Sequence, residues 1–112
     1  MLIMISSEGK TLESQPSIRF GRAPNFIKVN LNEDHWEAYQ NPAIDQRGGA
    51  GVKAAQFMLD QKITHVLTGR FGPNAHQALS AAGIKMITFD SSCNTVSEVI
   101  EAFKNNLLTE VD

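Results

Sequence analysis

The stretch from Gly48 to Asp90 constrains the fold of this chain most, because it alternates two helical patterns with two short apolar runs. Spacings of three, four and four residues predict that the apolar stripe of the first helix consists of Val52, Ala55, Leu59 and Ile63. After the apolar run Val66-Leu67, the second helix has an apolar face of Ala75, Ala78, Leu79 and Ala82. Gly83 is expected to end that helix in a left-handed conformation, and residues 84 to 89 have the composition of a strand.

Both predicted helices begin at loops that contain glycine. The first loop holds Gly48, Gly49 and Gly51, and the second is Thr68-Gly69-Arg70-Phe71-Gly72-Pro73-Asn74, in which Pro73 suits a first helical turn. Glycine lets backbone N–H groups approach a ligand closely, and the start of a helix presents unpaired amides and a positive dipole end. In open α/β sheets ligands bind beyond the carboxyl ends of the strands. We therefore expect an anion site where the two loops meet.

The rest of the chain predicts three strands and one helix. Residues 2 to 5 are a continuous apolar run typical of a central strand, and residues 26 to 31 and 36 to 40 are typical of an antiparallel hairpin. Residues 8 to 25 form a long irregular loop, a kind of segment that is often functional. Thr95 and Glu98 have capping-box spacing, which predicts a third helix with an apolar stripe of Val96, Val99, Ile100, Phe103 and Leu107. The remainder to Asp112 is expected to fray.

Length and composition favour one α/β domain over residues 1–112, with 42% hydrophobic residues available for a core. The net charge of −2 gives no overall attraction to nucleic acid or to an anionic membrane, so neither is expected as a partner. The apolar N-terminal run is too short for a signal or membrane segment. The single cysteine, Cys93, cannot form an internal disulfide, which fits a reducing cytoplasm.

Signals of catalysis are incomplete. Gly49 to Ala54 matches the dinucleotide fingerprint G-x-G-x-x-A, but no buried strand directly precedes it and no acidic residue follows about 20 positions later. The chain has no G-x-S-x-G elbow, and its first strand lacks the carboxylates of a metal-dependent nuclease. We therefore expect no enzyme activity. Two alternatives stay open: an enzyme acting on a small phosphorylated substrate, and a protein-interaction domain that regulates a partner.

Metal-ligating residues are sparse and scattered. His35, His65 and His76 have no ligand spacing. His76, in the first turn after Asn74, is the one that could face the expected site, but for all three a residue without a ligand role is the favoured interpretation. Cys93 lies just ahead of the third helix, where the helix dipole would lower the thiol pKa and favour binding of a soft metal. The plainer interpretation of Cys93 is a small residue in a turn.

Three arginines lie beside the predicted loops. Arg19 and Arg22 flank Phe20-Gly21 in the long irregular loop, and Arg70 lies in the second glycine loop. Solvated surface arginines are the plainer interpretation. Arginines near helix N-termini would nevertheless form an anion-binding pocket, because the planar guanidinium binds oxyanions in bidentate fashion.

These segments also resemble the dinitrogenase iron-molybdenum cofactor biosynthesis family, which includes NifX, NafY and the C-terminal part of NifB. The most specific segments are residues 19 to 24 (RFGRAP), 49 to 51 (GAG) and 72 to 75 (GPNA), and the similarity extends over nearly the whole chain. The resemblance implies a ribonuclease H-like motif with a mixed five-stranded sheet of order 3-2-1-4-5, an antiparallel second strand and about three helices. It also implies a non-enzymatic protein that binds or carries an iron-sulfur or molybdenum-containing cluster and works with cofactor-assembly proteins.

One departure from the family pattern bears on the site. Nitrogenase-associated members often have a histidine before the Phe-Gly of the first loop, a candidate cofactor ligand, and this chain has Arg19 there. We therefore expect an anionic cluster held by charge and by backbone amides, with Cys93 as an outlying metal ligand. The predicted cofactor-binding residues are Arg19, Arg22, Gly49, Ala50, Gly51, Arg70, Gly72 and Asn74.

Overall fold

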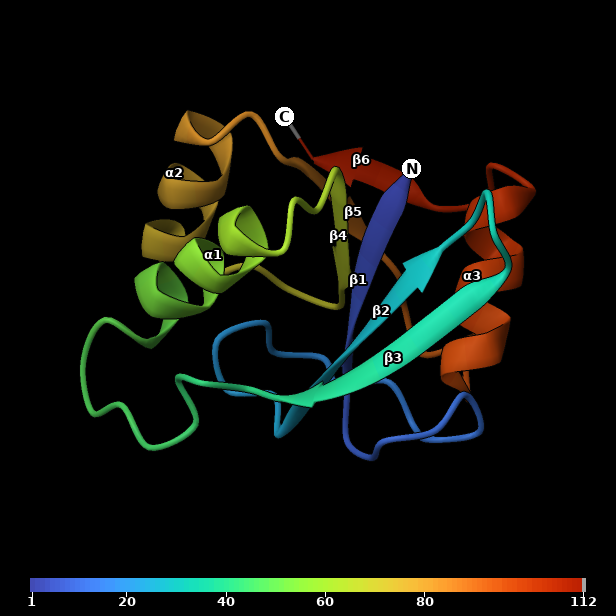
Figure 1. Ribbon diagram of the computed structural model, residues 1–112, viewed down its shortest axis with the longest axis horizontal. Helices are drawn as coiled ribbons and strands as arrows, with labels where there is room; N and C mark the ends of the chain where they lie inside the picture. Colours follow the sequence, from blue (N-terminus) through green and yellow to red (C-terminus); the bar gives the residue numbers. More distant parts are fainter. Residues whose placement is uncertain (112) are drawn as a thin grey trace.

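The computed structural model describes residues 1–111 as a mixed sheet of six strands with three helices (Figure 1). In chain order the elements are β1 (Leu2–Ser7), β2 (Asn25–Asn30), β3 (His35–Gln40), α1 (Ala50–Asp60), β4 (His65–Thr68), α2 (Pro73–Ala81), β5 (Lys85–Thr88), α3 (Val96–Lys104) and β6 (Thr109–Val111). The strand order is β3-β2-β1-β4-β5-β6. β2 runs antiparallel to both neighbours, whereas β1, β4 and β5 are parallel. The predicted fold class, strand order and antiparallel second strand are confirmed.

β6 extends the sheet beyond the five predicted strands. It pairs antiparallel with β5 and places Val111 opposite Met86. The expectation that the chain frays after the third helix is therefore wrong for Thr109–Val111, and Asp112 lies outside the described residues. Three residues are too few for the alternation of side chains to indicate a strand in the sequence.

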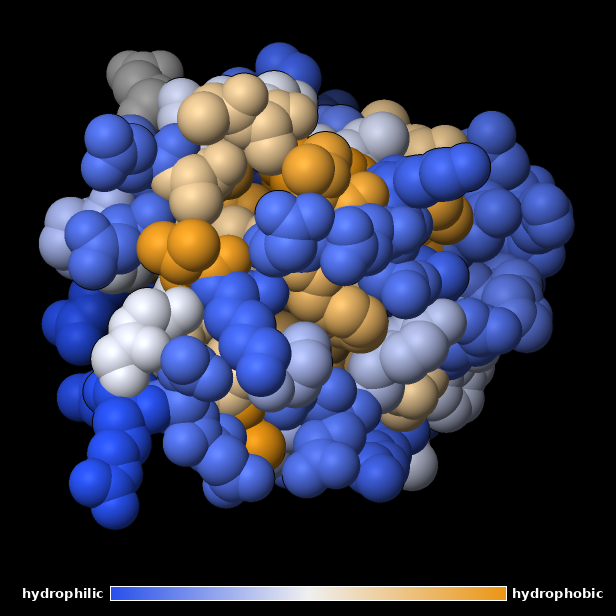
Figure 2. Space-filling view, turned by 60° about the vertical axis from the view of Figure 1, so that its left-hand side comes forward, coloured by the Kyte–Doolittle hydropathy of each residue, from blue (hydrophilic) through white to orange (hydrophobic). Residues whose placement is uncertain are grey.

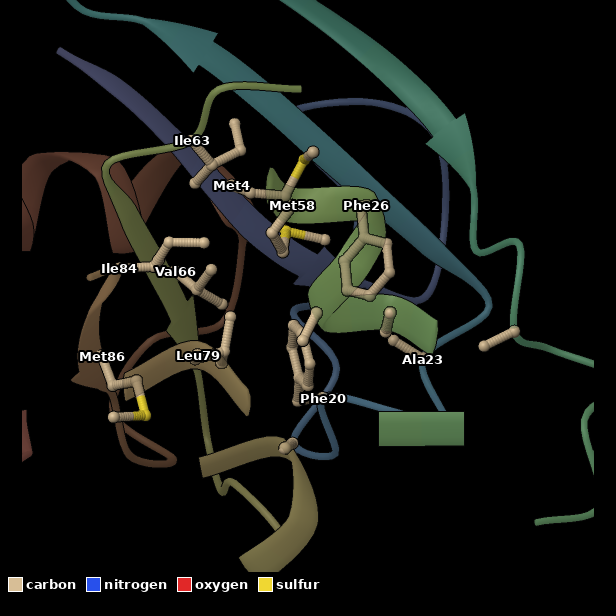
Figure 3. Packing of buried hydrophobic residues seen from close by; sticks show 14 of the residues in the cluster. Met4, Phe20, Ala23, Phe26, Met58, Ile63, Val66, Leu79, Ile84 and Met86 are labelled. Carbon is tan, nitrogen blue, oxygen red and sulfur yellow. The ribbon is translucent and has the colours of Figure 1, made fainter. Parts of the chain in front are cut away.

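Helices cover both faces of the sheet. α1 and α2 lie on one face and α3 lies on the other (Figure 1). The pleat of β1 sends Met4 toward α1 and α2, while Ile3 and Ile5 pack with the α3 side. Figure 3 shows the first of these clusters, with Phe20 of the long loop inserted among side chains from the sheet and both helices. The two faces explain why β1 is a continuous apolar run.

The buried face of α1 differs from the predicted stripe. The helix buries Ala50, Ala54, Ala55 and Met58. Val52 and Leu59 are 49% and 47% exposed, so their placement in the stripe is wrong, although Ile63 is buried just after the helix. Three of these four buried residues are alanines, which permit close approach of the helix to the sheet, and the fourth, Met58, is fully buried. Figure 2 shows the molecule with the α1 and α2 side turned forward, where apolar side chains reach the surface between hydrophilic ones.

The other two helices follow the sequence pattern more closely. α2 begins with Pro73 in its first turn and buries Ala75 and Leu79, and Gly83 has a φ of 74° as expected. α3 buries Val96, Val99 and Ile100 but ends at Lys104, so Leu107 lies outside it and is 74% exposed. Among the described residues, no helix is long and apolar enough to cross a membrane.

Candidate functional site

One cavity of about 300 Å³ lies where the N-termini of α1 and α2 meet the β1–β2 loop (residues 8–24). We call it the arginine cavity. It is lined by all eight residues predicted to bind the cofactor, namely Arg19, Arg22, Gly49, Ala50, Gly51, Arg70, Gly72 and Asn74, together with Phe20, Gly21, Pro73 and Ala75. Its volume equals roughly ten water molecules. The structure therefore brings the predicted site residues together, and their binding role stays a prediction.

Phe20 anchors the arginine-bearing part of the β1–β2 loop to the core. Its side chain is 1% exposed, and its ring lies 5.5 Å from that of Phe26 and 5.7 Å from that of Phe71, between ring centroids. The Phe20 amide donates to the Arg70 carbonyl at 3.3 Å, and Arg19 and Arg70 form a parallel β-bridge. The bridge holds the two arginines side by side at the cavity although they are far apart in the sequence.

Buried hydroxyl groups at the ends of β1 and β4 also fix the β1–β2 loop by hydrogen bonds. Ser6 Oγ donates to the Ser17 carbonyl at 2.6 Å and lies 2.6 Å from Thr68 Oγ1. Ser6 and Thr68 have no exposed surface. Because a buried hydroxyl must be hydrogen-bonded, this network fixes the position of Ser17, two residues before Arg19. No sequence pattern indicates these residues, because their spacing along the chain does not reveal a contact that forms only in the fold.

Asn41 is a second positioning residue that the sequence did not reveal. Its fully buried side chain donates to the carbonyls of Gly21 and Ala23 at 3.2 and 2.9 Å and accepts from the Ala43 amide at 2.8 Å. It thereby joins the turn that carries Arg22 to the β3–α1 loop (residues 41–49). In the sequence, the pair Asn41-Pro42 indicated only the end of a strand.

Glycine is required where the cavity walls touch. A Cβ on Gly21 would lie 3.1 Å from the Gly51 amide nitrogen, and a Cβ on Gly51 would lie 3.0 Å from Ala75 Cβ. These contacts bring the β1–β2 loop, the start of α1 and the start of α2 into direct backbone contact. The two helix N-termini therefore open into the same space.

The N-termini of α1 and α2 have no capping side chains. The N-cap residues are Gly49 and Gly72, neither helix has an acidic residue in its first turn, and no side chain caps either end. Within the described residues, the amides of Gly51, Val52, Asn74 and Ala75 have no protein acceptor. Such amides, with the positive ends of two helix dipoles, are donors available to an anion.

The cavity carries positive charge that no described carboxylate neutralises. Arg19, Arg22 and Arg70 are all exposed, and none of residues 1–111 that line the cavity is acidic. Across residues 1–111 the ion pairs involve lysines and a histidine, and none involves an arginine. Arg22 donates instead to the carbonyls of Gln46 at 2.8 Å and Arg47 at 3.5 Å. The cavity is therefore complementary to a ligand of negative charge.

Cys93 lies away from the arginine cavity, on the side of the sheet that α3 covers. Burial raises the pKa of its thiol, and the neighbouring Asp90 and Glu98 raise it further, against a lowering hydrogen bond from Ser92. The expected lowering of this pKa by the α3 dipole is wrong, because desolvation and two carboxylates outweigh it. His76 does not line the cavity either, and the described residues contain no group of three His, Cys, Asp or Glu side chains able to hold a metal ion.

Comparison with known proteins places this architecture in a family. Residues 1–106 match the dinitrogenase iron-molybdenum cofactor family. The solved apo form of the orange protein from Desulfovibrio gigas is 32% identical, with a TM-score of 0.92 over 98% of this chain and 92% of that one. A putative NifB protein from Thermotoga is 34% identical, with a TM-score of 0.85 over 97% and 91%. A search of curated proteins gave no match. The chain belongs to the dinitrogenase iron-molybdenum cofactor family.

Proposed function

We propose that this chain binds and carries an anionic metal cluster, of the iron-sulfur or molybdenum-containing kind, in the arginine cavity. The observation that carries the proposal is that three arginines and two uncapped helix N-termini surround one cavity, with no carboxylate among the lining residues that the structure describes. The family and its structural neighbours support a cofactor-related carrier role. Proteins that assemble the cofactor are then the partners that deliver or receive the cargo, and the unpaired cysteine suits a reducing cytoplasm.

The donor set fits a cluster that arrives with its own ligands. Guanidinium N–H groups and backbone amides donate hydrogen bonds to sulfide, thiolate or oxygen atoms at the surface of a cluster, and they balance its negative charge. They do not coordinate iron or molybdenum themselves. A carrier of this kind needs no catalytic residue, and the described lining of the arginine cavity contains no side chain that would act as a nucleophile or general base.

The test is anaerobic purification with metal analysis and an absorption spectrum, followed by titration with extracted iron-molybdenum cofactor. We expect saturable binding that weakens in Arg19→Ala and Arg22→Ala, because a hydrogen bond to a charged group contributes about 1.5–3 kcal/mol. Arg19→His is expected to favour the nitrogenase cofactor by supplying a nitrogen ligand.

Other outcomes distinguish the alternatives. Binding of phosphate esters without colour would favour an enzyme on a small phosphorylated substrate, since the same donors bind phosphate. Equal cofactor affinity in the wild type, Arg19→Ala and Arg19→His would contradict the proposed site and favour a protein-interaction domain.

A further inference from the structure

Every arginine of the chain lies at or beside the arginine cavity. Arg19, Arg22 and Arg70 line it, and the fourth, Arg47, belongs to the β3–α1 loop that leads into the first turn of α1. No lysine lines the cavity. Arginine has a planar set of N–H donors that lysine lacks. The presence of arginines, and not lysines, at this cavity therefore favours a role in recognising an extended anion over a general role in solubility.

Arg22 joins the cavity to the segment that carries Arg47. Its Nη1 donates to the Gln46 carbonyl at 2.8 Å and its Nη2 to the Arg47 carbonyl at 3.5 Å. A guanidinium has five N–H donors, so three remain for a ligand after these two bonds. The bonds also satisfy the carbonyl oxygens of Gln46 and Arg47 in the β3–α1 loop. Arg22 can therefore contact a ligand and hold the β3–α1 loop at the same time.

The β3–α1 loop is fixed at its start as well. The Asn41 amide donates to the Pro24 carbonyl at 3.0 Å, and the buried Ala43 follows within the core. Beyond Ala43 and Ile44, residues 45 to 49 are exposed, and the bonds from Arg22 are the side-chain contacts that tie Gln46 and Arg47 to the cavity. Asp45, the one acidic residue of this loop, forms no ion pair with any of the four arginines. The charge of Arg47 is therefore available to a ligand.

We propose that Arg47 is a fourth anion-binding side chain and that Arg22 positions it by holding the β3–α1 loop against the arginine cavity. This inference rests on the proposed function, since it names a further contact to the same cargo. Arg22 then has two roles, direct contact with the anion and placement of Arg47. Arg19 and Arg70 contact the anion without this link.

A double-mutant cycle tests the inference, with extracted iron-molybdenum cofactor as the probe under anaerobic conditions. We expect Arg47→Ala to weaken binding about five- to tenfold, and Lys10→Ala, which removes an exposed charge from the part of the β1–β2 loop near α3, to leave it unchanged. Arg22→Lys keeps the charge but loses the fork. In that background Arg47→Ala should lose most of its effect, whereas its effect should persist in the Arg19→Ala background.

Hydrogen exchange supplies a second readout. Cofactor should slow amide exchange in residues 44 to 48 of the wild type, and much less in Arg22→Lys. If Arg47→Ala binds as the wild type does, the inference is overturned while the proposed function stands. Equal effects of Arg47→Ala in the wild-type and Arg22→Lys backgrounds would overturn the positioning role of Arg22. Absence of any cofactor binding by the wild type would overturn the proposed function, and this inference with it.

Discussion

The N-termini of α1 and α2 contrast with the N-terminus of α3. At α3, Thr95 Oγ1 accepts from the Glu98 amide at 3.1 Å and Glu98 Oε1 accepts from the Asn94 amide at 2.7 Å, so the helix end is satisfied within the protein. At α1 and α2 glycine occupies the N-cap, and arginines line the space beyond. The capped end stabilises the fold, whereas the open ends leave donors for something that the chain does not contain.

Capping is the common solution, and the cost of leaving it out is modest. Glycine at an N-cap lowers stability by only a few tenths of a kcal/mol relative to serine or aspartate. The two uncapped ends lie side by side at the Gly51–Ala75 contact. Leaving them uncapped therefore costs little stability and lets a bound anion interact with two helix dipoles.

Charge reversal at the open ends should have the largest effect. Arg19→Glu is expected to weaken binding of extracted cofactor at least about 100-fold, because it replaces a donor with a repelling carboxylate. Lys10→Glu is the matched control, an exposed residue of the same loop with the same change in net charge. Similar losses in both variants, measured by anaerobic titration, would show that only overall charge matters.

Adding a capping side chain at the N-terminus of α2 should weaken cofactor binding and stabilise the fold. Gly72 has φ −73° and ψ 164°, and a Cβ there would meet nothing within 4 Å, so Asp fits as an N-cap. We expect Gly72→Asp to raise the free energy of unfolding by a few tenths of a kcal/mol and to weaken cofactor binding about tenfold. Gly72→Ser separates two causes, since it caps α2 without adding a charge, and it should weaken binding less than Gly72→Asp does. Unchanged affinity in Gly72→Asp would remove the α2 terminus from the site.

Removing the capping side chain of α3 should lower the stability of the fold without changing cofactor affinity. Thr95→Ala removes the acceptor of the Glu98 amide and is expected to cost about 1 kcal/mol in the free energy of unfolding. Denaturant titration would show this as a lower midpoint with an unchanged slope. Cofactor affinity should stay at the wild-type value. A loss of affinity as large as that of Gly72→Asp would mean that both kinds of helix end serve the site.

The smallest expected effect is that of pH on binding. The described lining of the arginine cavity contains no His, Cys, Asp or Glu side chain, so protein-side changes in affinity should be negligible between about pH 6 and 8. If Cys93 were a ligand, affinity would rise with pH as the thiolate formed, because its pKa is raised and the thiol form dominates below it. Cys93→Ser should accordingly leave metal stoichiometry and spectrum unchanged. A pH-dependent affinity that Cys93→Ser abolishes would restore this residue to the site.

The sequence predicted much of this contrast. The Thr95–Glu98 spacing indicated the capped end and the glycine loops indicated the open ones, because capping and turn chemistry are local. What it missed is decided by tertiary contacts. Asn41 and the pair Ser6 and Thr68 act across the fold through hydrogen bonds that have no sequence spacing of their own.

In two further places tertiary contacts, and not the hydrophobic pattern of the sequence, determine the structure. The buried face of α1 consists of Ala50, Ala54, Ala55 and Met58 and not of Val52 and Leu59, and its alanines permit close approach of the helix to the sheet. β6 was missed because its three residues gain their strand conformation from pairing with β5 and not from their own pattern.

The most direct test of the central claim is a map of amide resonances in the isotope-labelled chain during anaerobic titration with extracted cofactor. A paramagnetic cluster broadens the signals of nearby amides. We expect early loss of the resonances of Gly51, Val52, Asn74 and Ala75, while those of Ser97 and Glu98 at the capped start of α3 persist. Broadening centred on Cys93 and α3, or spread evenly over the chain, would contradict the central claim.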